Sequence, residues 1–187
     1  MKRHLLTITA LAFVFASCGG GGEEQPAAQQ ENQNQTEEQA TPVEEPAAEE
    51  APAEIPAVAE LSIEGNDQMM YNKKELQVYE GQKVKLTLKH VGQMPVETMG
   101  HNWTLLKQGV DYKDFGNAAA MAKDNNYIPK GREDEVIVHT EMIGGGQETT
   151  IEFEAPAVGD YKFLCTFPGH YAMMNGTFKV LPRPGAA

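Results

Sequence analysis

Cysteine is almost absent from this chain, which has only Cys18 and Cys165 among its 187 residues. That scarcity excludes the disulfide framework with which small secreted proteins often supplement a core. Long apolar runs are missing as well, because the mainly apolar stretch 5–16 is shorter than the roughly 20 residues that a transmembrane helix requires. Stability must therefore come from a packed core, for which about 125 residues suffice.

The first residues have the pattern of an export signal. Lys2 and Arg3 precede the apolar stretch 5–16, and small residues follow it. The sequence "FASC" followed by Gly19 resembles the lipobox of bacterial lipoproteins, in which the signal is cut before the cysteine and the cysteine is lipidated. We therefore predict a signal peptide at residues 1–17 and lipidation of Cys18. An ordinary secretory signal with an incidental cysteine is the alternative.

The segment that follows lacks basic residues and core-forming side chains. Residues 19–57 contain ten glutamates and no lysine or arginine, a composition that predicts a disordered acidic linker over residues 18–57. Without these glutamates and the two basic residues of the signal, 17 acidic and 13 basic residues remain, so the net charge changes from −12 to −4. The acidity belongs mainly to the linker, and we expect no nucleic-acid partner.

The remaining residues, 58–187, read as one all-β domain. The run "KVKLTLK" at 83–89 alternates polar and apolar residues, as a half-buried strand does. Eight such short runs predict a sandwich or barrel. One segment, 112–124, is rich in alanine and favours a short helix outside the sheets. The predicted strands contain the sequences "LSIEG", "LQVYEG", "KVKLTLK", "HNWTLL", "EVIVHT", "TTIEFEA", "DYKFLC" and "GTFKVL".

A soft ligand set stands near the C-terminus, in "CTFPGHYAMM". Cys165 ends a predicted strand, His170 lies five residues on and Met174 four beyond that, so that one loop can turn all three side chains to one point. Thiolate, imidazole and thioether together favour copper, and a blue-copper site needs a second histidine. We choose His101, after a glycine at a loop-to-strand junction. His90 and His139 lie within strand-like runs and are interpreted as structural.

Several motifs resemble azurins, single-copper members of the cupredoxin family. They are "CTFPGHYAMMNGTF", "MGHNW", "IEGNDQMMYN" and "VIVHT" followed by "IGGGQ", in family order and approximate spacing from about residue 60 to 180. The resemblance implies an eight-stranded Greek-key β-sandwich that binds one copper ion. No cysteines occupy the region of the azurin disulfide, around Ile63 and Lys83. By resemblance, the copper ligands are His101, Cys165, His170, Met174 and, more distantly, the carbonyl of Gly100.

The resemblance also assigns residues around the copper. Asn102 is expected to brace the loop at Thr166 and to contribute an amide hydrogen bond near the sulfur, beside Phe167. Trp103 is interpreted as a core residue. Of the ligands, only His170 is expected to reach the surface, and an apolar docking patch should surround it. That patch comprises Met69, Met94, Met99, Phe167, Pro168, Ala172 and Met173.

These residues predict a membrane-tethered, monomeric single-electron carrier rather than an enzyme, in the periplasm or on the cell surface of a bacterium. We expect partners such as c-type cytochromes or a terminal reductase or oxidase. Zinc is disfavoured because thioether is a poor zinc ligand, and no oriented base marks a Cys–His hydrolase. A binuclear copper site would need two cysteines in the loop. A copper chaperone or copper-storage protein remains the alternative, because the domain has eight methionines.

Overall fold

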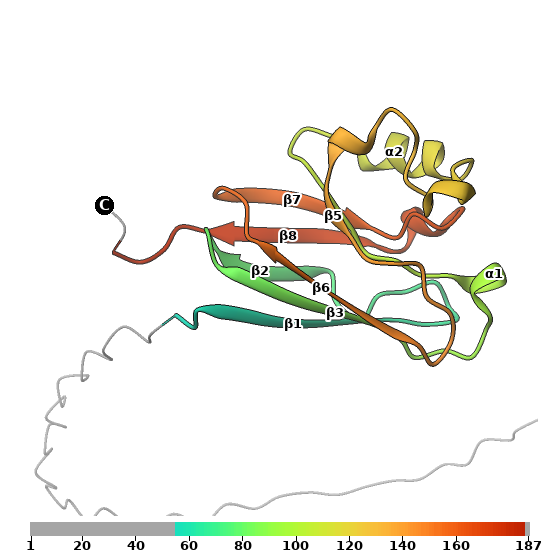
Figure 1. Ribbon diagram of the computed structural model, residues 1–187, viewed down its shortest axis with the longest axis horizontal. Coiled ribbons are helices and arrows are strands. Elements are labelled where there is room, and N and C mark those ends of the chain that lie inside the picture. The colour runs from blue at the N-terminus through green and yellow to red at the C-terminus, as the bar shows by residue number, and fades with distance from the viewer. Residues whose placement is uncertain (1–54, 186–187) are drawn as a thin grey trace, which may run out of the picture. The chain divides into compact units, whose positions relative to one another are not determined.

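Two β-sheets packed face to face form the folded domain (Figure 1). The computed structural model describes residues 55–185, so the predicted signal peptide, Cys18 and nearly all of the predicted linker lie outside the described residues. One sheet has the strand order β1-β3-β6 and the other β2-β8-β7-β4-β5. The strands are β1 (Val58–Gly65), β2 (Glu75–Tyr79), β3 (Lys83–His90), β4 (Thr104–Leu106), β5 (Val136–His139), β6 (Glu148–Glu154), β7 (Gly159–Leu164) and β8 (Asn175–Leu181).

Each of the eight runs predicted as strands forms a strand. In β3 the side chains of Val84, Leu86 and Leu88 are fully buried, whereas Lys83, Lys85 and Lys89, which alternate with them, are exposed. Side chains alternate across a strand, so the polar and apolar alternation places one face of β3 in the core. β1 runs parallel to β3, and β6 pairs with β3 on its other side in the antiparallel sense. The predicted all-β sandwich is confirmed.

The core between the sheets is aromatic at its centre. Trp103 is fully buried, and its ring centroid lies 5.6 to 6.1 Å from those of Phe153, Phe163 and Phe178. These rings come from both sheets, because Phe153 lies on β6 while Phe163 and Phe178 lie on β7 and β8. The predicted core position of Trp103 is therefore confirmed.

The helix predicted at 112–124 is shorter than expected. Helix α2 spans Tyr112–Ala119 and begins at the cap residue Asp111, whose side chain accepts hydrogen bonds from two backbone N–H groups. The chain then turns, which brings Ile128 against Phe115 in a second apolar cluster outside the main core. A second helix, α1 (Val96–Met99), is a single turn that the sequence analysis did not predict.

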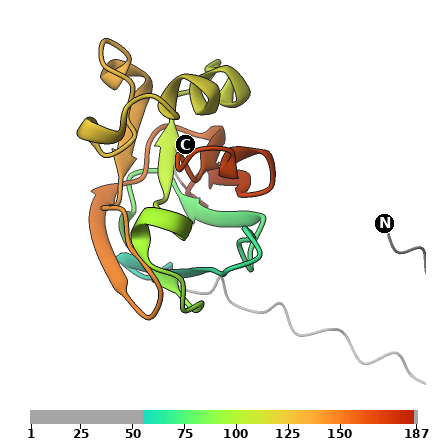
Figure 2. The ribbon, with the colours of Figure 1, turned by 90° about the vertical axis from the view of Figure 1, so that its right-hand side faces the viewer.

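One end of the sandwich is built from loops rather than strands. Helix α1, in the loop between β3 and β4, and the loop from β7 to β8 meet at this end, on the right of Figure 1 and facing the viewer in Figure 2. Helix α2 lies outside the sheets, beside β7 and the β7–β8 loop. Within residues 55–185, no helix is both long and apolar enough to cross a membrane.

Candidate metal centre

The loop from β7 to β8 closes on itself through backbone hydrogen bonds. The N–H of Cys165 donates to the carbonyl of Met174 at 2.9 Å, and the N–H of Met174 donates to the carbonyl of His170 at 2.7 Å. Gly169 makes the turn possible, because its φ of 81° lies in the left-handed region that a side chain disfavours. These hydrogen bonds fix the loop in a shape that buries the side chains of Cys165, His170 and Met174.

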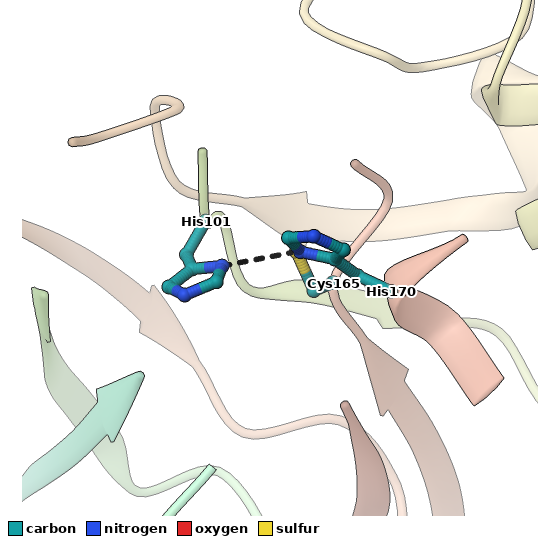
Figure 3. Close-up of side chains that lie close together, drawn as sticks. All are labelled: His101, Cys165 and His170. Carbon is teal, nitrogen blue, oxygen red and sulfur yellow. Dashed lines mark hydrogen bonds between the residues drawn. The ribbon is translucent and has the colours of Figure 1, made fainter. Parts of the chain in front are cut away.

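Three ligating side chains converge at this end. His101, Cys165 and His170 each offer one ligand atom, and these atoms all lie within 4.8 Å of one another. The sulfur of Cys165 is 4.0 Å from Nδ1 of His101 and 3.7 Å from Nδ1 of His170. Figure 3 shows the ring of His101 pointing toward Cys165 and the ring of His170 next to the same thiol. One thiol and two imidazoles form a donor set that suits copper.

A backbone contact fixes which nitrogen of His101 faces the site. Its Nε2 lies 2.9 Å from the carbonyl oxygen of Asn66, and because a carbonyl can only accept, Nε2 must carry the proton. Nδ1 is then left without a proton and points at Cys165. His90 stacks on His101, with ring centroids 4.3 Å apart, but both its ring nitrogens are engaged by the backbone. This occupancy agrees with the structural interpretation of His90.

Gly100 and Met174 complete the predicted set. The carbonyl oxygen of Gly100 lies 3.8 Å from the sulfur of Cys165. A Cβ at Gly100 would meet the carbonyl of Val96 at 2.7 Å, so only glycine allows this close approach. Met174 is fully buried, and its terminal methyl and the ring of His101 both crowd Gly65. Gly100 and Met174 therefore lie next to the group of His101, Cys165 and His170, and their role as ligands stays a prediction.

Asn102 clamps the two site loops together. Its side-chain N–H donates to the hydroxyl of Thr166, and its side-chain oxygen accepts from the backbone N–H of Thr166, both at 2.8 Å. All of these atoms are buried. Buried polar groups that are hydrogen-bonded to each other fix the relative position of their residues. The brace predicted between Asn102 and the residue after Cys165 is present.

Burial sets the protonation of the site when it holds no metal. Burial raises the pKa of the Cys165 thiol to about 12, although hydrogen bonds from the backbone N–H groups of Asn102 and Phe167 act in the opposite direction. Burial, together with the neighbouring His101, lowers the pKa of His170 to about 4. The pKa of His101 is lowered too, again mainly by burial. At neutral pH the site therefore holds one protonated thiol and two neutral imidazoles.

The copper-binding family is established by comparison with known proteins. Residues 57–181 match the family described as copper binding proteins, plastocyanin/azurin family. The chain belongs to this family. The resemblance to azurins is thereby confirmed, and the converging thiol and imidazoles of this azurin-like domain support one copper ion.

Individual relatives agree with the family match. Azurin-1 of Alcaligenes xylosoxydans xylosoxydans is 38% identical over 129 residues, which cover 67% of this chain and 99% of the relative. Outer membrane protein H.8 of Neisseria gonorrhoeae is 43% identical over 122 residues, covering 62% of this chain and 63% of the relative. Among solved structures, auracyanin A of Chloroflexus aurantiacus, titled a "blue" copper protein, is 30% identical with a TM-score of 0.60, covering 66% of this chain and 99% of that one.

The predicted docking patch of this azurin-like domain is only partly exposed. Met69, Met94 and Met173 are exposed to 38%, 41% and 53%. Phe167 is an exception, because its ring packs between Tyr127 and His170 and stays 9% exposed. The remaining predicted members are Pro168 and Ala172, which are exposed, and Met99, which is half-buried.

His170 is much less exposed in the structure than the sequence analysis predicted. Its side chain is only 3% exposed, although His101, Cys165 and Met174 are buried completely. The sequence analysis also passed over Tyr71, Met70 and Val91. Tyr71 is buried beside the site, while Met70 and Val91 are exposed on loops at the same end. Apolar residues in loops gave no periodic signal by which their burial could have been judged.

Proposed function

We propose that the protein is a membrane-tethered carrier of single electrons that cycles copper between Cu(I) and Cu(II). The observation that carries the proposal is the buried convergence of His101, Cys165 and His170 within 4.8 Å, in a chain of the plastocyanin/azurin family. Met174 would supply the weak axial donor and Gly100 the distant carbonyl. When bound, copper supplies the one-electron couple, and everything else is done by the chain.

The protein would fix the positions of the ligand atoms and keep water away from them. The clamp between Asn102 and Thr166 fixes the loop of Cys165 against the loop of His101. His101 is held in addition through Asn66. Donors that are already fixed move little when the charge at the site changes, and burial keeps water from acting as a further ligand. Small rearrangement favours fast electron exchange.

Electrons would enter and leave beside His170, the one of the four proposed side-chain ligands with any exposed surface. The exposed methionines Met69, Met94 and Met173 would form the docking patch, with Pro168 and Ala172 at its border. Flexible apolar side chains suit brief contacts with differing partners. Redox proteins such as c-type cytochromes or a terminal reductase or oxidase are the proposed partners, with the domain acting as a monomer.

The tether rests on the N-terminal sequence. The apolar stretch 5–16 followed by Cys18 supports export and lipidation, and the linker would give the domain reach from the membrane surface. One relative is named as an outer membrane protein, which supports the same placement. We therefore propose a location in the periplasm or on the cell surface of a bacterium.

Copper titration tests the carrier function. The purified protein with one equivalent of Cu(II) should absorb intensely near about 600 nm, as expected for thiolate bound to copper, and should bleach and recover through repeated reduction and oxidation. Retention of copper through these cycles separates a carrier from a chaperone. A colourless complex that gives up its copper to a weak chelator would contradict the proposal and favour a chaperone or storage protein.

The tether is tested separately by Cys18→Ser. The variant should move from the membrane fraction to the soluble fraction of cells and should keep the copper spectrum of the wild type. Continued membrane association of Cys18→Ser would refute lipidation at this residue without touching the proposed copper chemistry.

A further inference from the structure

Tyr71 places a hydroxyl group in the buried wall of the metal centre. It is 4% exposed, pairs through its backbone with Gly65 and packs its ring edge-on against Phe163, with centroids 5.8 Å apart. Its hydroxyl donates a hydrogen bond to the backbone carbonyl of Asn102. A buried hydroxyl is costly unless it is paired, so this contact fixes the position of the ring and of the carbonyl together.

The residue that Tyr71 holds lies directly against the loop of Cys165, because the backbone N–H of Thr166 donates to the Asn102 side chain at 2.8 Å. Burial raises the pKa of Tyr71, and the adjacent Cys165 raises it further. The hydrogen-bond contact with Tyr71 acts on the Cys165 thiol in the opposite direction and lowers its pKa. The hydrogen bond of the Tyr71 hydroxyl goes to the Asn102 carbonyl, in the residue that braces the loop of Cys165.

Asn102 is the residue through which Tyr71 reaches the rest of the site. Its side chain forms both hydrogen bonds to Thr166, and its backbone N–H is one of the donors to the Cys165 sulfur. Tyr71 holds the carbonyl of this same residue from the opposite loop. Three segments that are far apart in the sequence therefore meet at one residue, Asn102.

We propose that Tyr71 is a positioning residue of the copper centre, which holds Asn102 in place and with it the loop that carries Cys165, and so raises the reduction potential of bound copper. The proposal rests on the proposed electron-carrier function. Hydrogen bonds to the cysteine sulfur tune the potential of such sites. A donor withdraws electron density from the thiolate, and because Cu(II) depends on that density more than Cu(I), the oxidised form is weakened.

Tyr71→Phe tests this by removing only the hydroxyl and keeping the ring that packs on Phe163. Tyr161→Phe is the matched control, because the Tyr161 hydroxyl also donates to a backbone carbonyl, that of Ala157 at 2.8 Å, near the start of β7. Tyr71→Phe should lower the potential. We expect a shift of about threefold in the equilibrium constant for electron exchange with wild-type protein, which is about 28 mV at 59 mV per tenfold. Tyr161→Phe should leave the potential unchanged.

A second measurement uses the metal-free protein. Hydrogen exchange at the backbone N–H of Thr166, which donates to the Asn102 side chain, should become at least about threefold faster in Tyr71→Phe and stay unchanged in Tyr161→Phe. An unchanged or higher potential in Tyr71→Phe, an equal shift in Tyr161→Phe, or unaltered exchange at Thr166 would each overturn the proposal. If wild-type protein fails to cycle copper, the carrier function is wrong, and exchange at Thr166 still decides whether Tyr71 positions Asn102.

Discussion

The loop end of the domain and the outer face of the three-stranded sheet expose opposite kinds of side chain. At the loop end, methionines such as Met69, Met94 and Met173 are exposed around a buried metal centre. On the outer face of β1, β3 and β6, charges dominate and pair across strands. The pairs are Lys83–Glu152 at 3.1 Å, Lys89–Glu148 at 3.4 Å and Lys85–Glu60 at 3.9 Å.

The loop end is suited to contact with other proteins, whereas the outer face of the three-stranded sheet is suited to contact with water. Charged pairs on an exposed face contribute little to stability, but they keep that face soluble and block association through it. Exposed methionines have the opposite effect, since their apolar surface gains from being covered. If the protein is an electron carrier as proposed, this difference in surface composition would favour docking at the loop end.

Cys165→Ser is expected to produce the largest effect at the loop end. A serine hydroxyl is a harder ligand that stays protonated at neutral pH, so the absorption near about 600 nm should vanish and copper should bind far more weakly. Optical titration with Cu(II) measures both. Lys85→Met, on the outer face of the sheet, is the control and should titrate like wild type. A blue Cys165→Ser would show that the ligand assignment is wrong.

The metal-free protein should be most stable between about pH 6.5 and 9. In the folded state the pKa of His170 is lowered to about 4, so the unfolded chain binds more protons below pH 6.5 and the free energy of unfolding falls as pH drops toward 4. Above pH 9 the unfolded chain ionises the thiol of Cys165, whose folded pKa of about 12 keeps it protonated, so the free energy of unfolding falls again.

Urea unfolding of the metal-free protein across this pH range measures the effect. We expect a loss on the order of 2 kcal/mol between pH 7 and pH 4. His170→Gln, which cannot titrate, should lose less stability than wild type over the same interval. An identical acid profile in the two proteins would assign the loss to other groups.

Sequence predicted this molecule best where the pattern is local. The alternation in residues 83–89 identified β3, and the spacing from Cys165 through His170 to Met174 identified one side of the metal centre. His101 was chosen over His90 on a weaker signal, the preceding glycine. Tyr71 escaped notice because its role depends on a contact with Asn102, 31 residues away, that only the packed loops create.

The end of helix α2 and the burial of loop residues also could not be predicted from the sequence. The alanines of 112–124 favour a helix throughout, yet α2 ends at Ala119 because the chain turns to bring Ile128 against Phe115. Propensity yields to tertiary packing in such cases. Phe167 was assigned to an exposed patch for a similar reason, since nothing local indicates that Tyr127 covers its ring.

Met173→Lys should slow electron exchange while sparing the metal centre. Its side chain is 53% exposed, so a charge there costs little in folding but opposes apolar contact with a partner. We expect electron self-exchange, and exchange with a cytochrome, to slow by at least about tenfold, equivalent to about 1.4 kcal/mol, with the spectrum and potential nearly unchanged. Stopped-flow kinetics with a c-type cytochrome measure the second rate.

Val158→Lys is the control for that variant. Val158 is 45% exposed just before β7, whereas Cys165 directly follows that strand, so the same charge is added at the opposite end of the strand. Its exchange rates should match those of wild type. Equal slowing by both variants would mean that net charge, not the methionine patch, controls docking, and wild-type rates in Met173→Lys would remove the patch from the docking surface.

The smallest effect is expected from the outer face of the sheet. Lys83 and Glu152 lie 3.1 Å apart with side chains exposed to 62% and 53%, so water and salt screen their attraction. A double-mutant cycle with Lys83→Met and Glu152→Gln should give a coupling free energy of about 0.2 to 1 kcal/mol in urea unfolding, which fades at high salt. Copper spectra and exchange rates should stay those of wild type. A coupling free energy above about 2 kcal/mol, or altered electron-exchange rates, would mean that this face does more than contact water. The contrast drawn between the loop end and the outer face of the sheet would then be wrong.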